Sequence, residues 1–400
     1  MSGEPGMDSR QIEVLLKQKK IVTPSYIWDT DVLRAHVENM KNIVCDTAGL
    51  CYAMKANPFL ITEFKDMVDK IEVCSPGELQ ICMKHKIPGS KIIFSGVNKT
   101  KEDVEAAFEY GVAVMTIESR KHFLLIREYC EKHKVQADVY LRLTSGSQFG
   151  MDAEEIEKII AERENYPYIH ICGIHFFSGT QKKKTDKHKQ ELDELDAFML
   201  KLQKEYGLSN LTLEYGAGLA APYFEGEDFD RPYKDLEELA EYIKQKNASY
   251  RPVLELGRFF AYSCGVYLTK VEEVKCNKGH SYVLVDGGIH QLNYYGQNMA
   301  MRIPKMELLS DNESGGTQES TICGSLCTVA DVLVRKWSGP LPKEGDVFAF
   351  YNAGSYSVTE APALFLSRKL PAVYRYGEEN KIEVLRTQDE SYVHNLGIGE

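Results

Sequence analysis

Short apolar runs alternate with amphipathic segments between residues 50 and 256. Helical spacing of apolar positions is clear in several segments, at 101–110, 120–133, 186–206 and 233–246. The runs between helical segments are rich in strand-forming residues and predict eight strands, at 50–55, 71–74, 91–95, 112–117, 137–143, 170–177, 211–215 and 252–256. Eight strands separated by helices are typical of a (β/α)8 TIM barrel. A doubly wound open sheet is the alternative α/β architecture, but it does not predict eight strands.

The pattern changes after Arg258. Strand-like segments then follow one another with hardly any helical period between them, at 260–274, 281–285, 321–326, 331–337, 346–351, 372–376 and 382–386. These segments predict a second, β-rich domain, which we expect to be a barrel or a sandwich. The polar residues 310–320 predict an exposed loop.

The N-terminal residues divide between the two domains. A short helical pattern at 11–19 is followed by a strand near 23–28, and an amphipathic helix covers 29–45. We therefore predict that residues 29–260 form the barrel and that residues 1–28 and 261–400 form the β-rich domain.

Composition and charge narrow the range of functions. The chain has 400 residues, 43% hydrophobic and 27% charged, as in a globular protein with a large core. Its net charge of −11, with no long basic run, argues against nucleic acid as a partner. The absence of a signal-peptide core or a long apolar run argues against a membrane partner. Ten cysteines without paired spacing fit a reduced, cytoplasmic protein, and no His/Cys cluster indicates a metal site.

The most informative stretch is residues 51–58. Here an apolar strand delivers one lysine, Lys55, just before Asn57 and Pro58 break the strand. Burial at such a strand end can lower the pKa of a lysine, which can then form a Schiff base with a carbonyl cofactor. Taken alone, Lys55 is more simply a lysine whose stem lies along apolar surface. Active-site residues of TIM barrels gather at the C-terminal strand ends, so the other strand ends test the idea.

Small, polar or charged residues do follow four other predicted strands. They form the motifs Ser75-Pro76-Gly77-Glu78-Leu79, His175-Phe176-Phe177-Ser178-Gly179-Thr180-Gln181, Gly216-Ala217-Gly218 and Glu255-Leu256-Gly257-Arg258. Glycine N–H groups can cradle a phosphate, Arg258 can pair with one, and Glu255 can accept a hydrogen bond from a protonated ring nitrogen. Each motif alone is more often a turn or a surface ion pair, so their joint placement at strand ends carries the argument.

Two further motifs lie in the β-rich half. Cys327 and Asp331 are four residues apart and can place a thiol and a carboxylate at one site, although a free thiol is more often buried and structural. Tyr356 follows an Asn-Ala-Gly-Ser turn and can either hydrogen-bond a phosphate or serve as a core aromatic.

In this order, the motifs resemble those of the fold-type III pyridoxal-phosphate decarboxylases, the group of diaminopimelate and ornithine decarboxylases. Residues 52–57 resemble the lysine motif of the family, and residues 75–79 resemble its S-x-G-E-L motif. Residues 216–218 resemble the glycine-rich phosphate loop, residues 255–258 match E-P-G-R with one change, and residues 327–331 fall on C-E-x-x-D or C-D-x-x-D. The resemblance covers nearly the whole chain. It implies an alanine racemase-like TIM barrel, a C-terminal Greek-key-type β barrel, and pyridoxal 5'-phosphate as the cofactor.

The resemblance also implies roles for these residues. Lys55 would hold the cofactor covalently, and Glu255 would keep its ring nitrogen protonated. Cys327, reaching in from the second subunit of a homodimer with shared active sites, would reprotonate the α-carbon of an amino-acid substrate. The phosphate would lie against Thr180, Gly216, Gly218, Gly257, Arg258 and Tyr356.

Three positions depart from the family pattern. Phe177 stands where relatives have a histidine stacked on the cofactor ring; a phenyl ring stacks but cannot hydrogen-bond. Leu256 replaces the proline of E-P-G-R. Thr328 replaces the carboxylate that, in diamine-forming relatives, receives the distal ammonium of the substrate, a charged hydrogen bond worth about 1.5–3 kcal/mol.

These departures favour an L-amino acid with a neutral or conjugated distal group, bound near Cys327, Thr328 and Asp331. The chain is most similar to the subgroup that decarboxylates glutamate tethered to an acyl-carrier protein, as in butirosin biosynthesis. The basic cluster Lys182–Lys184 is a candidate contact for such a carrier protein.

Three alternatives stay open at the level of sequence. The first is a decarboxylase of free diaminopimelate, lysine or ornithine. The second is an amino-acid racemase, which would need a second base, usually a tyrosine, and which the motif at 327–331 disfavours. The third is a cofactor-free regulatory homologue, although Lys55, Glu255, Arg258 and Cys327 are all in place.

Overall fold

Two compact units make up the computed structural model, which describes residues 7–246, 250, 252–297, 299–310, 316–377 and 379–399. The barrel unit comprises Val37–Ala221 and Arg231–Phe259. The β-rich unit comprises Met1–His36, Pro222–Asp230 and Phe260–Glu400.

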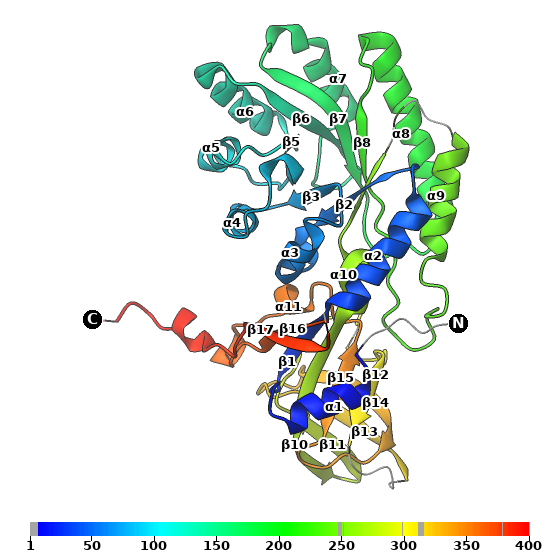
Figure 1. The fold of residues 1–400 in the computed structure, drawn as a ribbon, viewed down its shortest axis with the longest axis vertical. Helices are drawn as coiled ribbons and strands as arrows, with labels where there is room; N and C mark the ends of the chain where they lie inside the picture. The colour runs from blue at the N-terminus through cyan, green and yellow to red at the C-terminus, as the bar shows by residue number, and fades with distance from the viewer. Residues whose placement is uncertain are drawn as a thin grey trace. The chain divides into compact units, whose positions relative to one another are not determined.

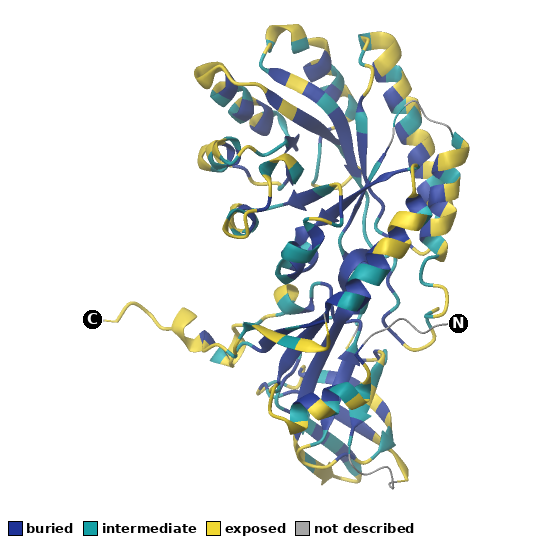
Figure 2. Ribbon diagram, in the orientation of Figure 1, coloured by how far each residue is buried: buried dark blue, intermediate teal, exposed yellow. Residues whose placement is uncertain are grey.

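The barrel unit is built on eight parallel strands that pair in chain order and close on themselves (Figure 1). They are β2 (Gly49–Ala53), β3 (Lys70–Val73), β4 (Ile92–Phe94), β5 (Val114–Ile117), β6 (Ala137–Leu143), β7 (Ile169–Phe177), β8 (Thr212–Gly216) and β9 (Val253–Leu256). The strands are buried almost throughout, as Figure 2 shows, because helices cover the outside of the barrel. The predicted TIM barrel and its eight strands are confirmed.

Helices follow the strands and turn one apolar face to them. The helices are α2 (Thr30–Val44), α3 (Ile61–Phe64), α4 (Pro76–Lys84), α5 (Lys101–Glu109), α6 (Arg120–His133), α7 (Ala153–Ala161), α8 (Thr185–Tyr206), α9 (Lys234–Lys246) and α10 (Arg258–Ala261). In α7, for example, Ile156, Ile159 and Ile160 are buried at helical spacing. No helix within the described part of the chain is long and apolar enough to span a membrane.

The β-rich unit contains nine strands and two short helices among the described residues. They are α1 (Ser9–Lys17), β1 (Ser25–Asp29), β10 (Gly265–Asn277), β11 (His280–Val285), β12 (Met306–Leu309), β13 (Thr317–Cys323), β14 (Val332–Pro340), β15 (Val347–Tyr351), α11 (Ser357–Glu360), β16 (Ala372–Gly377) and β17 (Lys381–Arg386). The strands pair in the order β14-β13-β11-β10-β1-β16-β17, with β15 branching from β10 and carrying β12. The second, β-rich domain is confirmed. The pairing of its described strands forms a branched mixed sheet, in which β1·β16 and β11·β13 are parallel, and not a closed ring.

The structure differs from the predicted elements at three places. The expected strand from residue 260 begins only at Gly265, because Arg258–Ala261 are helical and Tyr262–Cys264 form a 3-10 turn. An uninterrupted apolar run fits either element, so periodicity could not separate them. Strand β12 was not predicted, and β13 begins at Thr317 inside the expected loop, of which residues 311–315 lie outside the described residues.

The predicted barrel boundaries include residues that lie in the β-rich unit, namely residues 29–36, residue 260 and an inner segment. The inner segment is residues 222–230. The backbone explains the difference: Glu225 N–H donates to Ile303 O at 2.9 Å, and Lys305 N–H donates to Tyr223 O at 3.0 Å.

Candidate active site

Lys55 lies on a single 3-10 turn, Met54–Ala56, directly after β2. The turn ends where the side chain of Asn57 accepts a hydrogen bond from Phe59 N–H, with Pro58 opening the next turn. Tyr52 OH donates to the carbonyl of Asn57 at 2.9 Å and fixes this bend. The sequence Asn57-Pro58 therefore stops the strand and leaves Lys55 at the C-terminal mouth of the barrel.

Two buried carboxylates receive the Lys55 amine. Its Nζ lies 2.7 Å from Glu72 Oε2 and 3.4 Å from Glu255 Oε1, and 3.6 Å from Cys74 Sγ. The Lys55 side chain is 40% exposed, whereas the carboxylates are 3% and 6% exposed. The Lys55 amine is therefore partly exposed at the barrel mouth and ion-paired to carboxylates below it. The sequence suggested burial as the main influence on this amine, whereas the structure surrounds it mainly with negative charge.

Glu255 is also tied to a histidine. His175 Nε2 lies 2.9 Å from Glu255 Oε2, and the imidazole is 1% exposed. Burial raises the pKa of Glu255, but Lys55 and His175 outweigh it and hold the pKa below its usual value. Burial lowers the pKa of His175, but its hydrogen bond to Glu255 and the charges of Glu214 and Glu255 together outweigh that effect, so the net shift is upward. Glu255 is thus held as a carboxylate deep in the mouth of the barrel.

Glu72, His175 and Glu255 converge closely, with one ligand atom from each lying within 4.8 Å of the others. Their spacing is one that a metal ion can also use, and the sequence had not drawn attention to it. Lys55 already pairs with both carboxylates of this group. Because these carboxylates already bind an ammonium group, they also suit an organic cation or a protonated ring nitrogen placed beside Glu255.

Sequence reasoning gave no role to Glu72, Cys74, His175 or Glu214. Three of them, Glu72, His175 and Glu214, interrupt predicted apolar strands and are at most 3% exposed. Charged or polar residues within strands that are covered on both faces are rare. This was the signal that could have found them.

A second part of the site is a backbone cradle between the loops after β7 and β8. Gly218 has φ +59°, and a Cβ built on it would lie 2.0 Å from Gly179 O. Lys182 N–H donates to Gly218 O at 2.9 Å and joins the two loops. Arg258, which is buried, places its Nε 3.4 Å from Thr180 Oγ1 beside them. The structure thereby brings together three residues predicted from separate motifs, Thr180, Gly218 and Arg258. Gly257 directly precedes Arg258 in the sequence.

Phe177 and Gly216 form a matched pair at the ends of β7 and β8. They are register partners, and a Cβ on Gly216 would come within 2.6 Å of the Phe177 ring. The missing side chain of Gly216 therefore makes room for the phenyl ring at the mouth of the barrel.

The mouth also carries a second ion pair, between Arg142 at the end of β6 and Glu118 after β5. Arg142 Nη1 lies 2.5 Å from Glu118 Oε1, and the guanidinium lies over the Phe149 ring. Nearby Lys99 is 1% exposed and donates to Gly96 O at 2.7 Å; burial lowers its pKa to about 8. The motif at 75–79 works locally, since Ser75 Oγ caps α4 and Glu78 accepts from Cys74 N–H at 2.6 Å.

The basic cluster Lys182–Lys184 is not available as a three-lysine surface. Lys182 is buried, with Nζ 2.7 Å from Glu191 Oε2, and Glu191 also accepts from Tyr215 OH and Ser178 Oγ. The sequence alone could not separate Lys182 from its exposed neighbours, because its partner Glu191 is nine residues away on α8.

In the β-rich unit, Cys327 and Thr328 lie on a loop between β13 and β14. Cys327 is exposed. Asp331 is 3% exposed, and its two carboxylate oxygens accept from Ile289 N–H at 2.8 Å and Leu326 N–H at 2.7 Å. Gly324 packs on the same carboxylate, where a Cβ would come within 2.3 Å. Asp331 therefore folds the loop that presents Cys327 and Thr328.

Tyr356 holds an uncommon backbone conformation, with φ +65°, directly before α11. A non-glycine residue in the left-handed region costs of order 1–3 kcal/mol and is frequent at ligand-binding positions. Its place at the cofactor phosphate stays a prediction.

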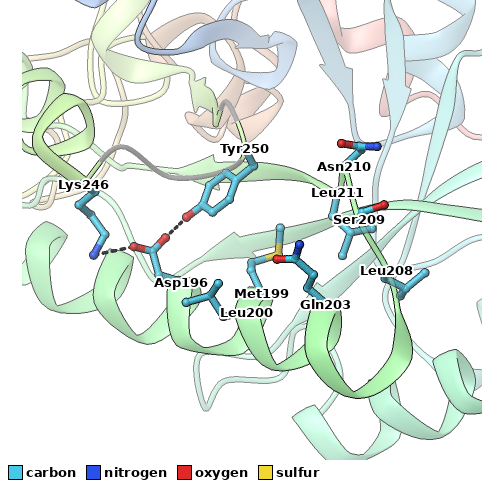
Figure 3. A pocket seen from close by; sticks show the side chains of 10 residues that line it. All are labelled: Asp196, Met199, Leu200, Gln203, Leu208, Ser209, Asn210, Leu211, Lys246 and Tyr250. Atoms are coloured by element: carbon cyan, nitrogen blue, oxygen red, sulfur yellow. Dashed lines mark hydrogen bonds and ion pairs between the residues drawn. The ribbon is translucent and has the colours of Figure 1, made fainter.

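A hollow of about 390 Å³ on the outside of the barrel unit is a poor candidate for chemistry (Figure 3). It lies between α8 and the segment 208–211 that leads into β8, where Asp196 pairs with Lys246 and Tyr250. The N-terminal end of a barrel strand is the end at which TIM-barrel active sites are not found. The site described above is therefore the one at Lys55.

The residues at Lys55 fit pyridoxal 5'-phosphate. They offer an amine for its carbonyl group, a buried carboxylate for its ring nitrogen, and a side-chain-free cradle beside an arginine for its phosphate. Residues 30–262 match the family model described as "Pyridoxal-dependent decarboxylase, pyridoxal binding domain". The chain belongs to this family. It is a pyridoxal-phosphate-dependent amino-acid decarboxylase, as the motifs had predicted.

Curated relatives align over most of their own length. The chain is 28% identical to the L-glutamyl-[BtrI acyl-carrier protein] decarboxylase of Niallia circulans, covering 91% of each chain. It is 26% identical to the 2-[(L-alanin-3-ylcarbamoyl)methyl]-2-hydroxybutanedioate decarboxylase of Staphylococcus aureus, covering 86% of this chain and 92% of the relative. It is 27% identical to the diaminopimelate decarboxylase of Zymomonas mobilis, covering 88% and 86%.

Solved structures share the fold. A diaminopimelate decarboxylase of M. jannaschii superposes with a TM-score of 0.82 at 21% identity, covering 95% of this chain and 92% of the other. At this identity the likeness concerns the arrangement of the chain, and it agrees with the barrel and the β-rich unit described above.

Proposed function

We propose that this enzyme decarboxylates an L-amino acid whose distal group is neutral or conjugated, such as a glutamyl thioester on an acyl-carrier protein. One observation carries the proposal: the loop with Cys327 has no carboxylate available for a distal ammonium. Between residues 324 and 331 the one acid is Asp331, and both of its oxygens are engaged by backbone N–H groups.

Thr328 supplies no substitute for that carboxylate. Its hydroxyl accepts from Ala330 N–H at 3.3 Å and is uncharged. A substrate with a free ammonium tail would lose a charged hydrogen bond of about 1.5–3 kcal/mol, whereas an amide or thioester tail would not. The names of two relatives agree with this, since one acts on a carrier-bound glutamyl group and the other on a carbamoyl conjugate.

The barrel residues prepare the cofactor for the reaction. When bound, pyridoxal phosphate accepts the electron pair left on the α-carbon as CO2 departs. Lys55 would hold the cofactor, and Glu255, kept ionised by Lys55 and His175, would hold the proton of its ring nitrogen. Phe177, at the end of β7, would lie against the ring. Thr180, Gly216, Gly218, Gly257, Arg258 and Tyr356 would hold the phosphate.

Cys327 returns a proton to the α-carbon, and it does so in the active site of a second copy of the chain. Its loop ends in an exposed apolar tip, with Val329 99% exposed. Met299, which lines the same hollow as Val329, is 78% exposed. Such a surface is suited to being covered by another protein chain. A homodimer with shared sites would cover this tip and bring the thiol to the partner's cofactor.

A diaminopimelate decarboxylase is the second candidate, because a relative with that name is almost as similar as the first. This candidate requires another acid to receive the distal ammonium. Lys99 and Arg142, near the barrel mouth, would repel that ammonium, although Glu118 neutralises part of their charge.

The two candidates separate when CO2 release is followed with pure, cofactor-loaded protein. The panel holds free lysine, ornithine, diaminopimelate and glutamate, together with glutamate as a thioester on a phosphopantetheine arm. We expect turnover of the thioester alone. Turnover of a free diamino acid at ordinary enzyme efficiency, about 10⁴ M⁻¹s⁻¹ or more, would contradict the proposal. Racemised amino acid without CO2 would contradict decarboxylation itself.

A further inference from the structure

The loop after β7, residues 178–182, forms one side of the backbone cradle and rests on a buried carboxylate. Glu191, on α8, receives three side-chain donors. Lys182 Nζ lies 2.7 Å from its Oε2, Tyr215 OH donates to the same oxygen at 2.6 Å, and Ser178 Oγ donates to Oε1. Ser178 begins the loop and Lys182 ends it, so one carboxylate holds both ends of the loop.

The same loop is also bonded to the loop after β8. Ala221 N–H donates to Gln181 Oε1 at 2.6 Å, and Gln181 Nε2 donates to Ala221 O at 3.0 Å. The backbone of Lys182 bonds to Gly218, as described above. Gln181 has φ +55°, a left-handed conformation that is uncommon for a residue with a side chain and persists where the surroundings hold it. The shape of the loop is therefore imposed by its contacts.

Stability alone is a weak reason for the ion pair beneath the loop. The side chains of Lys182 and Glu191 are 3% and 9% exposed. Taking two charges out of water costs free energy that their pairing seldom recovers, and apolar residues of similar volume are often at least as stable. Helix α8 already has apolar residues buried along its length, such as Leu195 and Leu202. The buried pair therefore fits a requirement for fixed geometry in the loop.

We propose that Glu191 is a positioning residue for the cofactor phosphate, because it holds the loop in the shape that places Thr180 beside Gly218 and Arg258. A loop that is already ordered binds an anion without the loss of conformational entropy that ordering it on binding would require. A carboxylate in contact with the phosphate would repel it, so Glu191 acts through the two ends of the loop. This inference rests on the proposed function, in which the phosphate lies in this cradle.

The test compares how cofactor-free protein binds pyridoxal 5'-phosphate and pyridoxal, which lacks the phosphate. Both aldehydes can react with Lys55 and give visible absorption, but only the first can use the cradle. The double variant Lys182→Met with Glu191→Leu removes the ion pair at nearly constant volume and leaves neither charge buried alone. We expect its affinity for pyridoxal 5'-phosphate to fall roughly 10- to 100-fold, the equivalent of ordering one or two loop residues on binding. Its affinity for pyridoxal should equal that of wild type.

An ion pair elsewhere on α8 provides the matched control. Lys201 Nζ lies 2.6 Å from Glu157 Oε1 on α7, and Glu157 also accepts from a tyrosine, Tyr206, at 3.2 Å. None of these residues belongs to the loops of the cradle. Lys201→Met with Glu157→Leu should therefore bind both aldehydes as wild type does.

Two further measurements do not depend on the folding of the double variant. Ser178→Ala removes one end of the attachment and leaves Lys182 paired with Glu191, so it should weaken binding of pyridoxal 5'-phosphate about threefold to tenfold, the equivalent of one hydrogen bond, and leave pyridoxal binding unchanged. Hydrogen exchange needs no cofactor: the amide of Lys182, bonded to Gly218 O, should be protected in the cofactor-free wild type and should exchange at least about tenfold faster in Ser178→Ala or the double variant.

Three results would overturn the inference: wild-type affinity for pyridoxal 5'-phosphate in the variants, equal losses of affinity for the two aldehydes, or a Lys182 amide that exchanges equally fast in wild type and variants. Failure of the proposed function looks different, because it shows in the wild-type protein. No visible absorption with either aldehyde would contradict the assignment of Lys55, and equal wild-type affinity for the two aldehydes would contradict the placement of the phosphate in the cradle.

Discussion

The barrel interior and the Cys327 loop present their reactive groups in opposite ways. In the barrel, Lys55, Glu72, Glu255 and His175 come from different strands and pair with one another below the mouth. On the loop, the thiol of Cys327 is exposed, and Asp331 is turned inward onto backbone N–H groups. The charged groups of the barrel interior pair with one another. The Cys327 loop instead presents an exposed thiol and has no charged side chain available to pair with a substrate.

The difference separates two tasks. Strands of a closed barrel are fixed on both sides, so they hold charged groups at constant distances for a cofactor. A surface loop tolerates substitution at its tip, so the change from an acid to Thr328 can alter substrate choice without disturbing the barrel. Under the proposed function, most of the cofactor site and the loop that selects the substrate lie in different units of the chain.

Removing the barrel lysine should have the largest effect. Lys55→Ala should abolish the visible absorption of bound cofactor and lower CO2 release on the order of 10³-fold or more, since the covalent attachment is lost. Lys101→Ala, at an exposed lysine paired with Glu128 on the barrel surface, is the matched control and should keep full activity. A Lys55→Ala protein that retains the absorption and the activity would contradict the assignment of the cofactor to Lys55.

Neutralising the buried carboxylate should have the next largest effect. Glu255→Gln leaves His175 and Lys55 without their shared anion and cannot hold a proton on the ring nitrogen. We expect kcat to fall about 10²–10³-fold, as when one preorganised electrostatic partner is removed. Glu128→Gln, at an exposed carboxylate, should match wild type. A kcat for Glu255→Gln close to wild type would contradict the role of Glu255.

A mixed dimer tests whether the Cys327 loop of one chain completes the barrel site of another. A purified heterodimer of Lys55→Ala and Cys327→Ala chains should recover about half of the wild-type rate, because one of its two shared sites keeps both residues. Each parent homodimer should be nearly inactive, and Cys276→Ala, at another exposed cysteine, should be unaffected. An inactive heterodimer, or an active Cys327→Ala homodimer, would show that the loop does not complete a partner's site.

The smallest effect concerns stability. An acid whose pKa is raised on folding weakens the fold as pH increases, since the unfolded chain releases the proton first. For Glu214 this window runs from its ordinary value of 4.5 to about 8. Across it, we expect the free energy of unfolding of wild type to fall relative to Glu214→Gln by up to about 1.4 kcal/mol per pH unit. Urea unfolding at several pH values checks this, and parallel curves for the two proteins would contradict a neutral Glu214.

Much of the barrel and its cofactor site could be predicted from the sequence, because the signals are local. Each strand is a short apolar run, and Lys55, Gly218 and Arg258 sit in motifs at the ends of such runs. The closed barrel then follows from the count of strands, and closure brings the motifs together.

The rest depends on partners that lie far apart in the sequence. The sequence suggests that Lys182 is a surface charge, but in the structure it is buried in an ion pair with Glu191. The sequence also suggests that Asp331 is a substrate ligand, but both of its oxygens accept hydrogen bonds from the backbone of Ile289 and Leu326. Glu72 and Glu214 each stood alone in an apolar strand, and only the barrel register places them near Glu255 and His175.

We propose that the Cys327 loop selects a substrate without a distal ammonium. The most direct test compares kcat/KM for free lysine with kcat/KM for the glutamyl thioester, in wild type, Thr328→Glu and Thr328→Gln. We predict that wild type prefers the thioester and that Thr328→Glu raises the lysine-to-thioester ratio about 10- to 100-fold, the effect of one charged hydrogen bond. Thr328→Gln, of equal length but neutral, should leave the ratio unchanged. A wild-type preference for free lysine, or a ratio that Thr328→Glu does not move, would contradict the account.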